Sequence, residues 1–380
     1  MDETKRLLRP PMPIRELSVA GYRSIRELRF RLKQINVLTG PNGCGKSNLY
    51  NSLFLLSKAA TGGMAQIIAE EGGMDSVLWA GKRKKATKQE PVRMKIAMIS
   101  DQFSYELSCG LPVPMESAFN HDPEIKEERV WFGATPHASN TMFSRGSSGA
   151  WARGRDGGRV SFSGELMRNE SVLSQLREPH LYPELSALRS ELANWRFYHQ
   201  FRTDSLSPLR QPQIGVRTPI LSHDGRDLAA ALTTIDEVGD SEAMRRAIAD
   251  AFHGATLIVR NSQSRFGIEL EMPGMLRPLH AQEFSDGTLR YLCLVAALLS
   301  PRPPTLLALN EPETSLHPDL LKPLAALVTQ ASRASQIWIT THSQSLAQQI
   351  AAESGVKPIS LHLVEGATGI VGQGLILPDE

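Results

Sequence analysis

The sequence has few of the features that mark secreted, metal-bound or membrane-spanning proteins. Its three cysteines, Cys44, Cys109 and Cys293, lie far apart, with no C-x-x-C pair and no zinc spacing. The ten histidines show no paired metal-ligand spacing either. The longest near-continuous apolar run, Tyr291 to Leu299, is too short to cross a bilayer, and the N-terminal residues carry no apolar signal region. These absences argue against a disulfide scaffold, a zinc domain and a membrane span, and we expect a cytoplasmic protein.

Neither sign of charge dominates, because 42 basic and 40 acidic side chains leave a net charge of +2. The chain as a whole therefore has no strong field that would attract nucleic acid or a membrane. Sustained heptads are missing between Ser47 and Asn310, which excludes a long coiled-coil arm. With 41% hydrophobic residues, a chain of 380 residues suffices for one large or two ordinary domains with a sizeable core.

What the sequence does contain is a complete phosphate-binding loop of the pattern G-x-x-x-x-G-K-[ST]. Its glycines let backbone N–H groups approach the phosphates, Lys46 reaches the β/γ oxygens, and Ser47 can bind Mg²⁺. A short strand at 34–39 leads into the loop and leucines at helical spacing follow it, as an anion site at a helix N-terminus requires. The pattern predicts binding of ATP with Mg²⁺. The predicted ATP-binding residues here are Gly40, Pro41, Asn42, Gly43, Cys44, Gly45, Lys46, Ser47 and Asn48.

Three further motifs follow in the second half of the chain. An apolar strand ends in Asn310-Glu311-Pro312-Glu313, with a carboxylate pair, where a P-loop ATPase places a Mg²⁺-holding residue and the base that orients the attacking water. A second buried strand ends just before His342, which can reach the γ-phosphate. Residues 285–288, Ser-Asp-Gly-Thr, precede an apolar helix and offer a second anion site. Each motif alone has an ordinary structural interpretation, such as a helix cap, but their order and spacing indicate an ATPase.

The strand and helix patterns predict an α/β fold with an added antiparallel layer. Short runs at 14–19, 27–32 and 34–39 predict three strands, and alternating runs from 92 to 162 predict antiparallel strands with a mobile loop at 133–148. A buried strand is predicted at 194–201. The apolar runs at 305–309 and 336–340, with a helix between them, predict a βαβ unit of parallel strands.

Taken in order, the motifs resemble those of the ABC-type ATPase heads of the SMC, RecF and overcoming-lysogenization class, and within it the compact AAA-family ATPases. The resemblance extends from Ile14 to about Val364. It implies a P-loop NTPase head with a mixed central sheet, an antiparallel β layer and a helical second lobe. It also implies a nucleotide lobe formed by 1–201 plus 300–380 and a second lobe formed by 202–299.

The resemblance also assigns roles to single residues. It implies that Glu311 is the catalytic base that closes Walker B, that His342 is the switch histidine, and that Arg23 lies near the phosphates. Residues 315–318 resemble the D-loop. The implied signature motif consists of Ser285, Asp286, Gly287 and Thr288. The implied Mg²⁺ ligands are Ser47, Asn310 and the sensing glutamine, for which Gln200 is the candidate and Gln102 and Gln175 are alternatives.

In ABC heads the signature serine of one protomer faces the γ-phosphate held by another, so the resemblance implies a homodimer around two ATP molecules. Asn310 stands where the pattern has an aspartate, and its neutral amide offers no charge to Mg²⁺. We therefore expect slow, partner-stimulated hydrolysis. The short segment after His342 leaves no room for the nuclease domain of some relatives, so a nuclease would be a separate chain.

The leading functional hypothesis is an ATPase that acts in DNA repair, recombination or phage defence, with DNA or a separate effector protein as partner. The alternative is an ATP-gated interaction switch with little intrinsic hydrolysis, and a transporter subunit is a third, less favoured reading. Two basic segments bear on DNA binding. Residues 82–85 form either a solvated loop or a contact to the phosphate backbone. Four arginines around Trp151 lie in a hairpin that is either a surface turn or a nucleic-acid contact, namely Arg145, Arg153, Arg155 and Arg159.

Overall fold

The computed structural model describes residues 13–81, 92–114 and 116–372, which form two compact units. The first, here called the parallel-sheet unit, comprises Gln34–Thr39 and Arg196–Pro358. The second, here called the antiparallel-sheet unit, comprises the described residues within 13–33, 40–195 and 359–372. The two lobes expected from the sequence, one formed by 1–201 plus 300–380 and the other by 202–299, differ in their bounds from these two units. The lobes stay a prediction.

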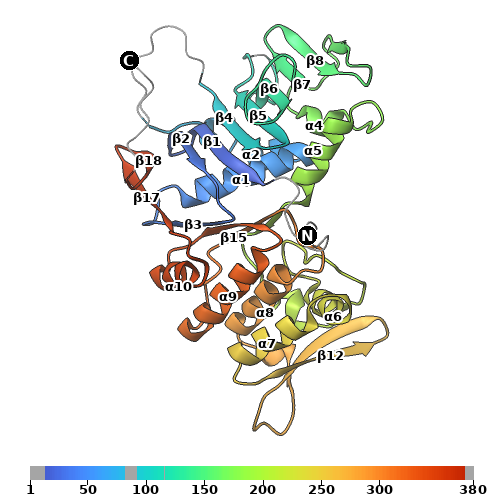
Figure 1. Cartoon of the computed structure of the whole chain (residues 1–380), viewed down its shortest axis with the longest axis vertical. Helices are drawn as coiled ribbons and strands as arrows, with labels where there is room; N and C mark the ends of the chain where they lie inside the picture. The colour runs from blue at the N-terminus through green and yellow to red at the C-terminus, as the bar shows by residue number, and fades with distance from the viewer. Residues whose placement is uncertain (1–12, 82–91, 115, 373–380) are drawn as a thin grey trace, which may run out of the picture. The chain divides into compact units, whose positions relative to one another are not determined.

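The parallel-sheet unit is built on strands in the order β10-β15-β16-β3, all of them parallel. Figure 1 labels β15 and β3. Every residue of β3, β15 and β16 is buried, which accounts for the continuous apolar runs in the sequence. Because parallel strands share one direction, these strands end at the same edge of the sheet. The strand bounds are Arg196–Tyr198 (β10), Leu306–Asn310 (β15), Gln336–Thr340 (β16) and Ile35–Thr39 (β3).

Helices with apolar faces complete the core of this unit. Residues 289–298 of α8 are all buried, whereas the buried residues of α9 follow the spacing of an amphipathic helix. One hydrophobic cluster joins all these helices to the strands. The helix bounds are Leu228–Val238 (α6), Ser241–Ala251 (α7), Asp286–Leu298 (α8), Leu321–Ala331 (α9) and Gln344–Ser354 (α10), with short 3₁₀ turns at Pro208–Arg210 (η2), Ala281–Glu283 (η3) and Pro318–Leu320 (η4).

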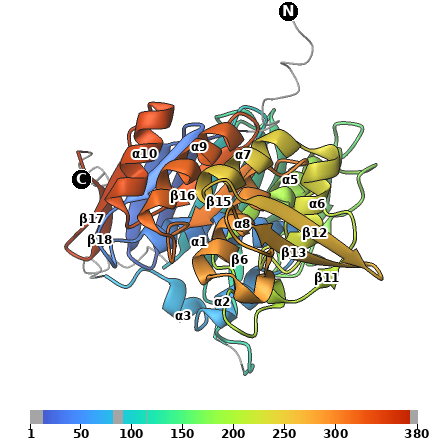
Figure 2. The ribbon, with the colours of Figure 1, turned by 90° about the horizontal axis from the view of Figure 1, so that it is seen from below.

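A β-hairpin packs on α6 and α7 of the same unit and extends outward in Figure 2. Its two strands, β12 (Thr256–Ser262) and β13 (Arg265–Glu271), pair in unbroken antiparallel register. Gln263 and Ser264 form the turn with φ of +51° and +62°, the left-handed pair that a two-residue hairpin favours. The short strands β11 (Gln213–Ile214) and β14 (Leu279–His280) also pair with β13.

The antiparallel-sheet unit contains a sheet in the order β2-β1-β4-β5-β6-β7-β8-β9. Its strands are Ile14–Tyr22 (β1), Ile25–Arg31 (β2), Met94–Ser100 (β4), Phe103–Gly110 (β5), Glu124–Phe132 (β6), Thr141–Gly146 (β7), Gly149–Arg153 (β8) and Arg159–Phe162 (β9). A hairpin of Ile359–Val364 (β17) and Ala367–Ile370 (β18) belongs to this unit as well. The helices are Lys46–Thr61 (α1), Met64–Glu70 (α2), Met74–Val77 (α3), Val172–Gln175 (α4) and Pro183–Asn194 (α5).

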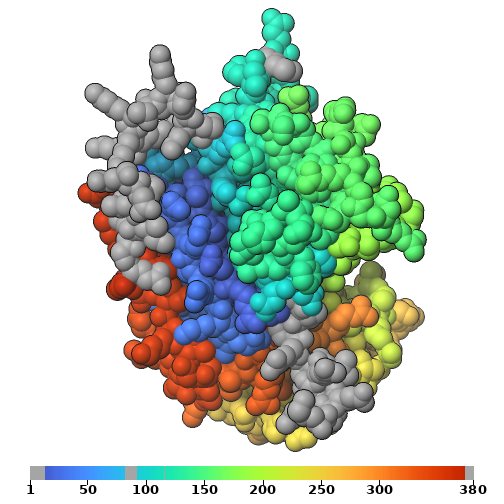
Figure 3. Space-filling view, turned by 45° about the horizontal axis from the view of Figure 1, so that its top comes forward, coloured from blue at the N-terminus to red at the C-terminus, as the bar shows by residue number. Residues whose placement is uncertain are grey.

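The two faces of this sheet differ in polarity. One face is apolar and packs on α1, with buried side chains such as Leu17, Val19 and Leu107. The other face carries a cross-strand row of Glu106, Arg129, Ser144 and Trp151. Part of the surface of this unit, coloured blue to green, is visible in Figure 3. The alternation is the one expected for an antiparallel sheet with one face buried.

The structure confirms the predicted α/β class and corrects several element bounds. The predicted loop at 133–148 is wrong, because β7 occupies Thr141–Gly146 and pairs with both β6 and β8. The strand predicted at 194–201 is shorter, since only Arg196–Tyr198 pairs with β15. The basic segment 82–85 lies outside the described residues. Within the described part of the chain, no helix combines the length and the apolar character that crossing a bilayer requires.

Candidate functional site

The predicted phosphate loop folds as a glycine-bounded turn. Gly43 and Gly45 have φ of +77° and +101°, a backbone region that glycine enters without strain. A Cβ built at Gly43 would meet no atom within 4 Å, so the space above the loop is open there. Lys46 is buried, and its Nζ donates hydrogen bonds to the carbonyl oxygens of Gly40 at 2.7 Å and Pro41 at 3.0 Å. The loop therefore curls around a positive charge.

The N-terminus of α1 completes an anion-binding arrangement. Gly45 is the N-cap, no side chain caps the helix, and its first turn contains no acidic residue. The hydroxyl-bearing Ser47 is exposed in this first turn. Uncapped N–H groups and the positive end of a helix dipole attract phosphate oxygens. The side chains and the backbone of the loop thus suit a triphosphate.

Two neighbouring segments of the same unit hold this helix terminus. Asn48 Nδ2 donates to Ser24 Oγ at 2.8 Å, and Ser24 Oγ lies 2.7 Å from Thr368 Oγ1. A Cβ on Gly45 would lie 2.1 Å from that Thr368 oxygen, so only glycine fits there. The sequence analysis missed Thr368, because a lone threonine far along the chain carries no motif.

Arg23 lies in the turn next to Ser24, with φ of +47°. Its Nη2 contacts Glu71 Oε2 at 2.9 Å, and the same carboxylate accepts hydrogen bonds from Tyr22 at 3.1 Å and from Asn51 at 3.1 Å. Burial, followed by the charge of Glu71, raises the pKa of the Tyr22 hydroxyl, which therefore stays protonated and donates. Glu71 fixes the segment that carries Arg23, a support that the sequence did not indicate.

At the carboxyl edge of the parallel sheet, Glu311 faces His342. Glu311 Oε1 lies 2.9 Å from His342 Nε2, and both side chains are about one-third exposed (35% and 38%). Glu311 also has φ of +46°, which is uncommon for a non-glycine residue. Its N–H donates to the Thr340 carbonyl at 2.8 Å. Strained backbone of this kind concentrates at functional sites, and here it carries the predicted catalytic base.

Asn310 occupies the last position of β15 and is buried. Its Oδ1 accepts a hydrogen bond from Thr340 Oγ1 at 2.7 Å. The contact orients the amide, which contributes a dipole but no charge. The sequence-based interpretation of this residue as a weak Mg²⁺ partner stays a prediction.

Glu313, the second carboxylate of the Asn-Glu-Pro-Glu motif, organises the loop that contains His342, a role that the sequence did not indicate. One of its carboxylate oxygens accepts hydrogen bonds from Thr341 Oγ1 at 2.6 Å, His342 N at 3.0 Å and Ser343 N at 3.2 Å. Ser343 in turn caps α10 by accepting from Leu346 N. One glutamate thus holds the end of β16, the histidine and the start of a helix.

The predicted signature motif forms the N-terminus of α8. Ser285 caps the helix, since its Oγ accepts from Thr288 N at 3.0 Å. Asp286 pairs with Arg210, whose Nη2 lies 2.7 Å from Asp286 Oδ1 and whose side chain is only 11% exposed. A Cβ on Gly287 would lie 2.5 Å from the backbone oxygen of Ser315, in the predicted D-loop. The motif is therefore rigidly held within its own unit, and Arg210 is a support that no sequence signal revealed.

The three candidate sensing glutamines lie in different surroundings. Gln200 is exposed two residues beyond β10, and β10 runs parallel to β15, so it follows a strand end at the same edge as Asn310. The side chain of Gln175 is hydrogen-bonded to the backbone of a neighbouring loop, since its Oε1 accepts from Met167 N at 2.7 Å. Gln102 is exposed between β4 and β5. This placement favours Gln200, whose role stays a prediction.

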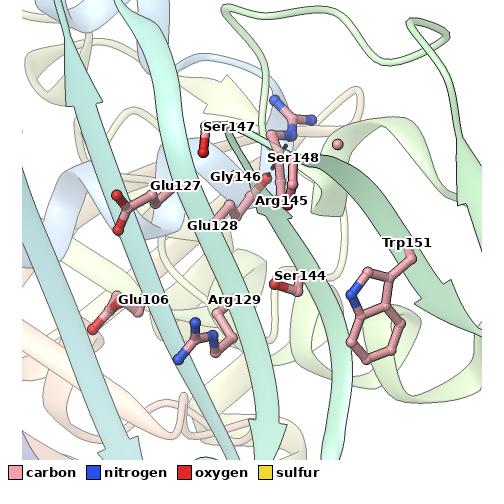
Figure 4. Close-up of a pocket in the computed structure, with 11 residues that line it drawn as sticks. Glu106, Glu127, Glu128, Arg129, Ser144, Arg145, Gly146, Ser147, Ser148 and Trp151 are labelled. Atoms are coloured by element: carbon pink, nitrogen blue, oxygen red, sulfur yellow. Dashed lines mark ion pairs between the residues drawn. The ribbon is translucent and has the colours of Figure 1, made fainter. Parts of the chain in front are cut away.

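A pocket of about 360 Å³ lies elsewhere, in the antiparallel-sheet unit (Figure 4). It contains Arg145 and Trp151 of the predicted basic hairpin. Arg145 forms a buried ion pair with Glu128, and Arg153 donates to the carbonyl oxygens of Thr141, Ala138 and Ser139. Arg159 stacks over Trp151 with its Cζ 4.1 Å from the ring centroid. Three of the four arginines therefore make contacts within the fold, which weakens the nucleic-acid interpretation of this hairpin.

Among residues 13–81, 92–114 and 116–372, no group of three or more histidine, cysteine, aspartate or glutamate side chains is placed to hold a metal ion. Mg²⁺ commonly takes one or two protein ligands and completes its octahedron with nucleotide phosphates and water. The exposed hydroxyl of Ser47 fits that mode of binding.

The chain was compared with known proteins. No curated protein matches it. Solved structures that it resembles include an SMC head bound to the C-winged helix domain of ScpA (15% identity, 94% of this chain and 97% of that chain, TM-score 0.49). An SMC head domain from Thermotoga maritima has 16% identity, with 95% and 98% covered and a TM-score of 0.45. The Smc head domain with an extended coiled coil from Pyrococcus furiosus, bound to the C-terminal domain of ScpA, has 14% identity, 95% and 96% covered, and a TM-score of 0.49.

Family models give the firmer assignment. A model described as "Protein of unknown function" matches residues 12–62, which contain the phosphate loop. A second model, "AAA domain, putative AbiEii toxin, Type IV TA system", matches residues 154–347, half of the chain, which contain the signature motif, Glu311 and His342. This match confirms the resemblance to ABC/AAA-type ATPase heads that the motifs indicated. The chain belongs to this AAA domain family of ATPases.

Proposed function

We propose that this protein binds ATP with Mg²⁺ and hydrolyses it slowly, in a homodimer that shares two sites. The observation that carries the proposal is the pairing of Glu311 with His342 at 2.9 Å, on strained backbone at the carboxyl edge of the sheet. β3 ends at this same edge, and the phosphate loop is the next segment of the chain. Family membership, the open loop and the uncapped α1 support nucleotide binding.

The residues that would hold the nucleotide are those of the phosphate loop. Lys46 would exchange its loop carbonyl partners for phosphate oxygens, the α1 N–H groups would donate to the same phosphates, and Arg23 would contribute a further charge. Ser47, Asn310 and Gln200 are the proposed Mg²⁺ contacts. The ion, when bound, neutralises charge on the β/γ-phosphates.

Glu311 and His342 are the proposed catalytic residues. The carboxylate of Glu311, about one-third exposed, would accept a hydrogen bond from the attacking water and orient it. His342 contacts this carboxylate and would report the γ-phosphate. Asn310 supplies no negative charge at the end of β15, so we propose a low rate of turnover.

The signature motif is proposed to act on the nucleotide of a second copy of the chain. Ser285 and the first N–H groups of α8 form an anion-attracting helix terminus, as at α1, although here the serine already caps the helix. A shared site of this kind makes hydrolysis depend on dimerisation.

Mixing two inactive variants tests the shared site. Lys46→Ala removes the phosphate-loop charge, and Ser285→Asp keeps a good helix cap but places a carboxylate where a phosphate would bind. Each variant alone should release no phosphate from ATP. Their equimolar mixture should regain about a quarter of the wild-type rate, because half of the dimers are mixed and each has one intact site. A mixture that stays inactive, with active wild type, would place each site within one chain.

A second candidate is an ATP-gated interaction switch in which dimerisation is the output and hydrolysis only resets it. The neutral Asn310 favours this reading. Size measurement with and without ATP, together with turnover in the presence and absence of DNA, separates the two. We further propose a cytoplasmic protein that acts with DNA or an effector protein in repair, recombination or phage defence. The family description, which names a toxin of a type IV system, supports a role with a partner.

A further inference from the structure

Arg290 connects α8, here called the signature helix because it begins with the predicted signature motif, to the backbone of Glu311. It lies on α8, is only 7% exposed, and its Nη2 donates to the Glu311 carbonyl oxygen at 2.8 Å. Burial lowers the pKa of this guanidinium, and the nearby carboxylates of Glu313 and Glu311 act in the opposite direction. An arginine is rarely buried without a partner, so the partner that it does have is informative.

The contact holds a residue whose backbone is strained. Glu311 has φ of +46°, and such a conformation persists only where its surroundings enforce it. Both of its backbone polar groups are fixed. Its N–H donates to Thr340 O at 2.8 Å, and its carbonyl accepts from Arg290 Nη2 at 2.8 Å and from Thr314 N in its own turn at 3.1 Å. Arg290 is thus the side chain that ties this turn to α8, and it helps to set the direction in which the Glu311 side chain leaves the backbone.

A second contact joins α8 to the same segment. A Cβ on Gly287 would lie 2.5 Å from the Ser315 carbonyl oxygen, and Ser315 also has a left-handed φ, of +64°. The two strained residues after β15 are therefore each in contact with the first turns of α8. A shift of α8 must move Glu311, Ser315 or both.

We propose that Arg290 is a positioning residue that fixes the Glu311 carboxylate against His342 and ties its orientation to the position of the signature helix. The inference rests on the proposed function, since it assigns Glu311 to ATP hydrolysis. Arg290 itself touches no reacting atom. Its part is to make the geometry of the hydrolytic glutamate depend on the helix that carries Ser285.

Steady-state kinetics of Arg290→Met and Arg290→Lys test this role. Arg290→Met should lower kcat for ATP by about 10- to 100-fold, the cost of a misplaced catalytic group, with the KM for ATP little changed. Arg290→Lys should recover part of the loss, because an ammonium can still donate one hydrogen bond. The matched control is Arg245→Met on α7, where the arginine is 66% exposed and pairs with Asp236. Equal kcat in folded Arg290→Met and wild type would overturn the proposal.

A readout that needs no turnover keeps this test separate from the proposed function. In protein with ¹³C-labelled histidine, Arg290→Met should shift the ring resonances of His342, because that ring pairs with Glu311, whose carbonyl Arg290 holds. The resonances of His223, which bonds the Phe197 carbonyl in the same unit, should stay in place. His342 resonances that do not move in folded Arg290→Met would overturn the positioning role. If wild type showed no ATP turnover but Arg290→Met still shifted the His342 resonances, the proposed hydrolysis would be refuted and the positioning role would stand.

Discussion

A buried arginine and a glutamate meet in both units of this protein, but in opposite circumstances. In the antiparallel-sheet unit, Glu128 is fully enclosed beside Arg145, with their nearest atoms 3.6 Å apart. Its carboxylate accepts hydrogen bonds from Tyr105 at 2.7 Å, Ser171 at 2.6 Å and Val172 N at 3.1 Å. In the parallel-sheet unit, Arg290 is buried, but the side chain of Glu311 remains about one-third exposed.

The difference separates a structural carboxylate from one available for chemistry. Glu128 joins β6 to the first turn of α4, and its oxygens are occupied by the fold. Glu311 is held through its backbone, so its carboxylate is free to exchange His342 for another partner. Backbone strain adds to the contrast, since Glu311 has a positive φ and Glu128 lies in a regular strand. The predictions below break one arrangement or the other.

The largest effect is expected from Glu311→Gln. A side chain that orients the attacking water contributes about 10²- to 10⁴-fold to turnover, and the amide should lose that contribution. ATP affinity and the midpoint of thermal unfolding should stay near wild type, because the backbone bonds of Glu311 remain. Phosphate release and a thermal melt of the same samples check this. Turnover within a factor of about two of wild type would show that Glu311 is not the base.

Glu128→Ala should act on stability. It leaves the Arg145 guanidinium buried without its carboxylate, and breaking such a pair costs about 3–5 kcal/mol. Urea unfolding measures the loss of free energy. At temperatures where the variant is folded, ATP turnover should remain near wild type. A stable Glu128→Ala protein with lost turnover would reverse the roles assigned to the two glutamates.

Asn310→Asp sharpens the account of the catalytic edge. A carboxylate at the end of β15 adds the charge that the amide lacks, so half-maximal turnover should need about tenfold less Mg²⁺, equivalent to about 1.4 kcal/mol. A Mg²⁺ titration of turnover for both proteins measures this. Asn310→Leu is the control, since it lacks both the charge and the dipole. An Asn310→Asp protein with the wild-type Mg²⁺ requirement and rate would refute the charge argument.

The smallest effect is a pH dependence at Glu128. Burial raises the pKa of this carboxyl above its ordinary value of 4.5, so the folded state binds the proton more tightly than the unfolded state. The stabilisation linked to that proton is fully present below pH 4.5. It is lost as the pH rises through the folded-state pKa of Glu128. Wild type should therefore lose stability relative to Glu128→Gln from pH 4.5 towards neutrality. Urea unfolding of both proteins across this range measures it, and a change in the opposite direction would mean that the surrounding donors outweigh burial.

Local patterns predicted much of the fold. The buried parallel strands were predicted from continuous apolar runs, and β16 has the predicted bounds, Gln336–Thr340. The helix predicted between the two apolar runs is α9, Leu321–Ala331, whose buried residues follow an amphipathic pattern. β7 was missed because small and polar residues surround it, and because its pairing with β6 and β8 on both sides, which stabilises it, is not visible in its own local pattern.

The predicted site residues all belong to sequence motifs. The contacts that hold those residues in place were not predicted. Glu313, Arg210 and Thr368 each act through contacts with residues distant in sequence, such as Thr368 with Ser24. Such contacts follow from the tertiary fold, so no spacing in the sequence reports them. Arg290 is the clearest case, since it lies in the apolar helix α8 and donates a hydrogen bond to Glu311, the residue that follows β15.

The most direct test of the central claim is equilibrium binding of ATP, with Mg²⁺, to wild type and to Lys46→Ala. The account predicts saturable binding of one ATP per chain by wild type, and an affinity at least about tenfold weaker for Lys46→Ala, because a charge-assisted contact contributes about 1.5–3 kcal/mol. Wild type that does not retain ATP, or Lys46→Ala that binds it equally well, would contradict the account.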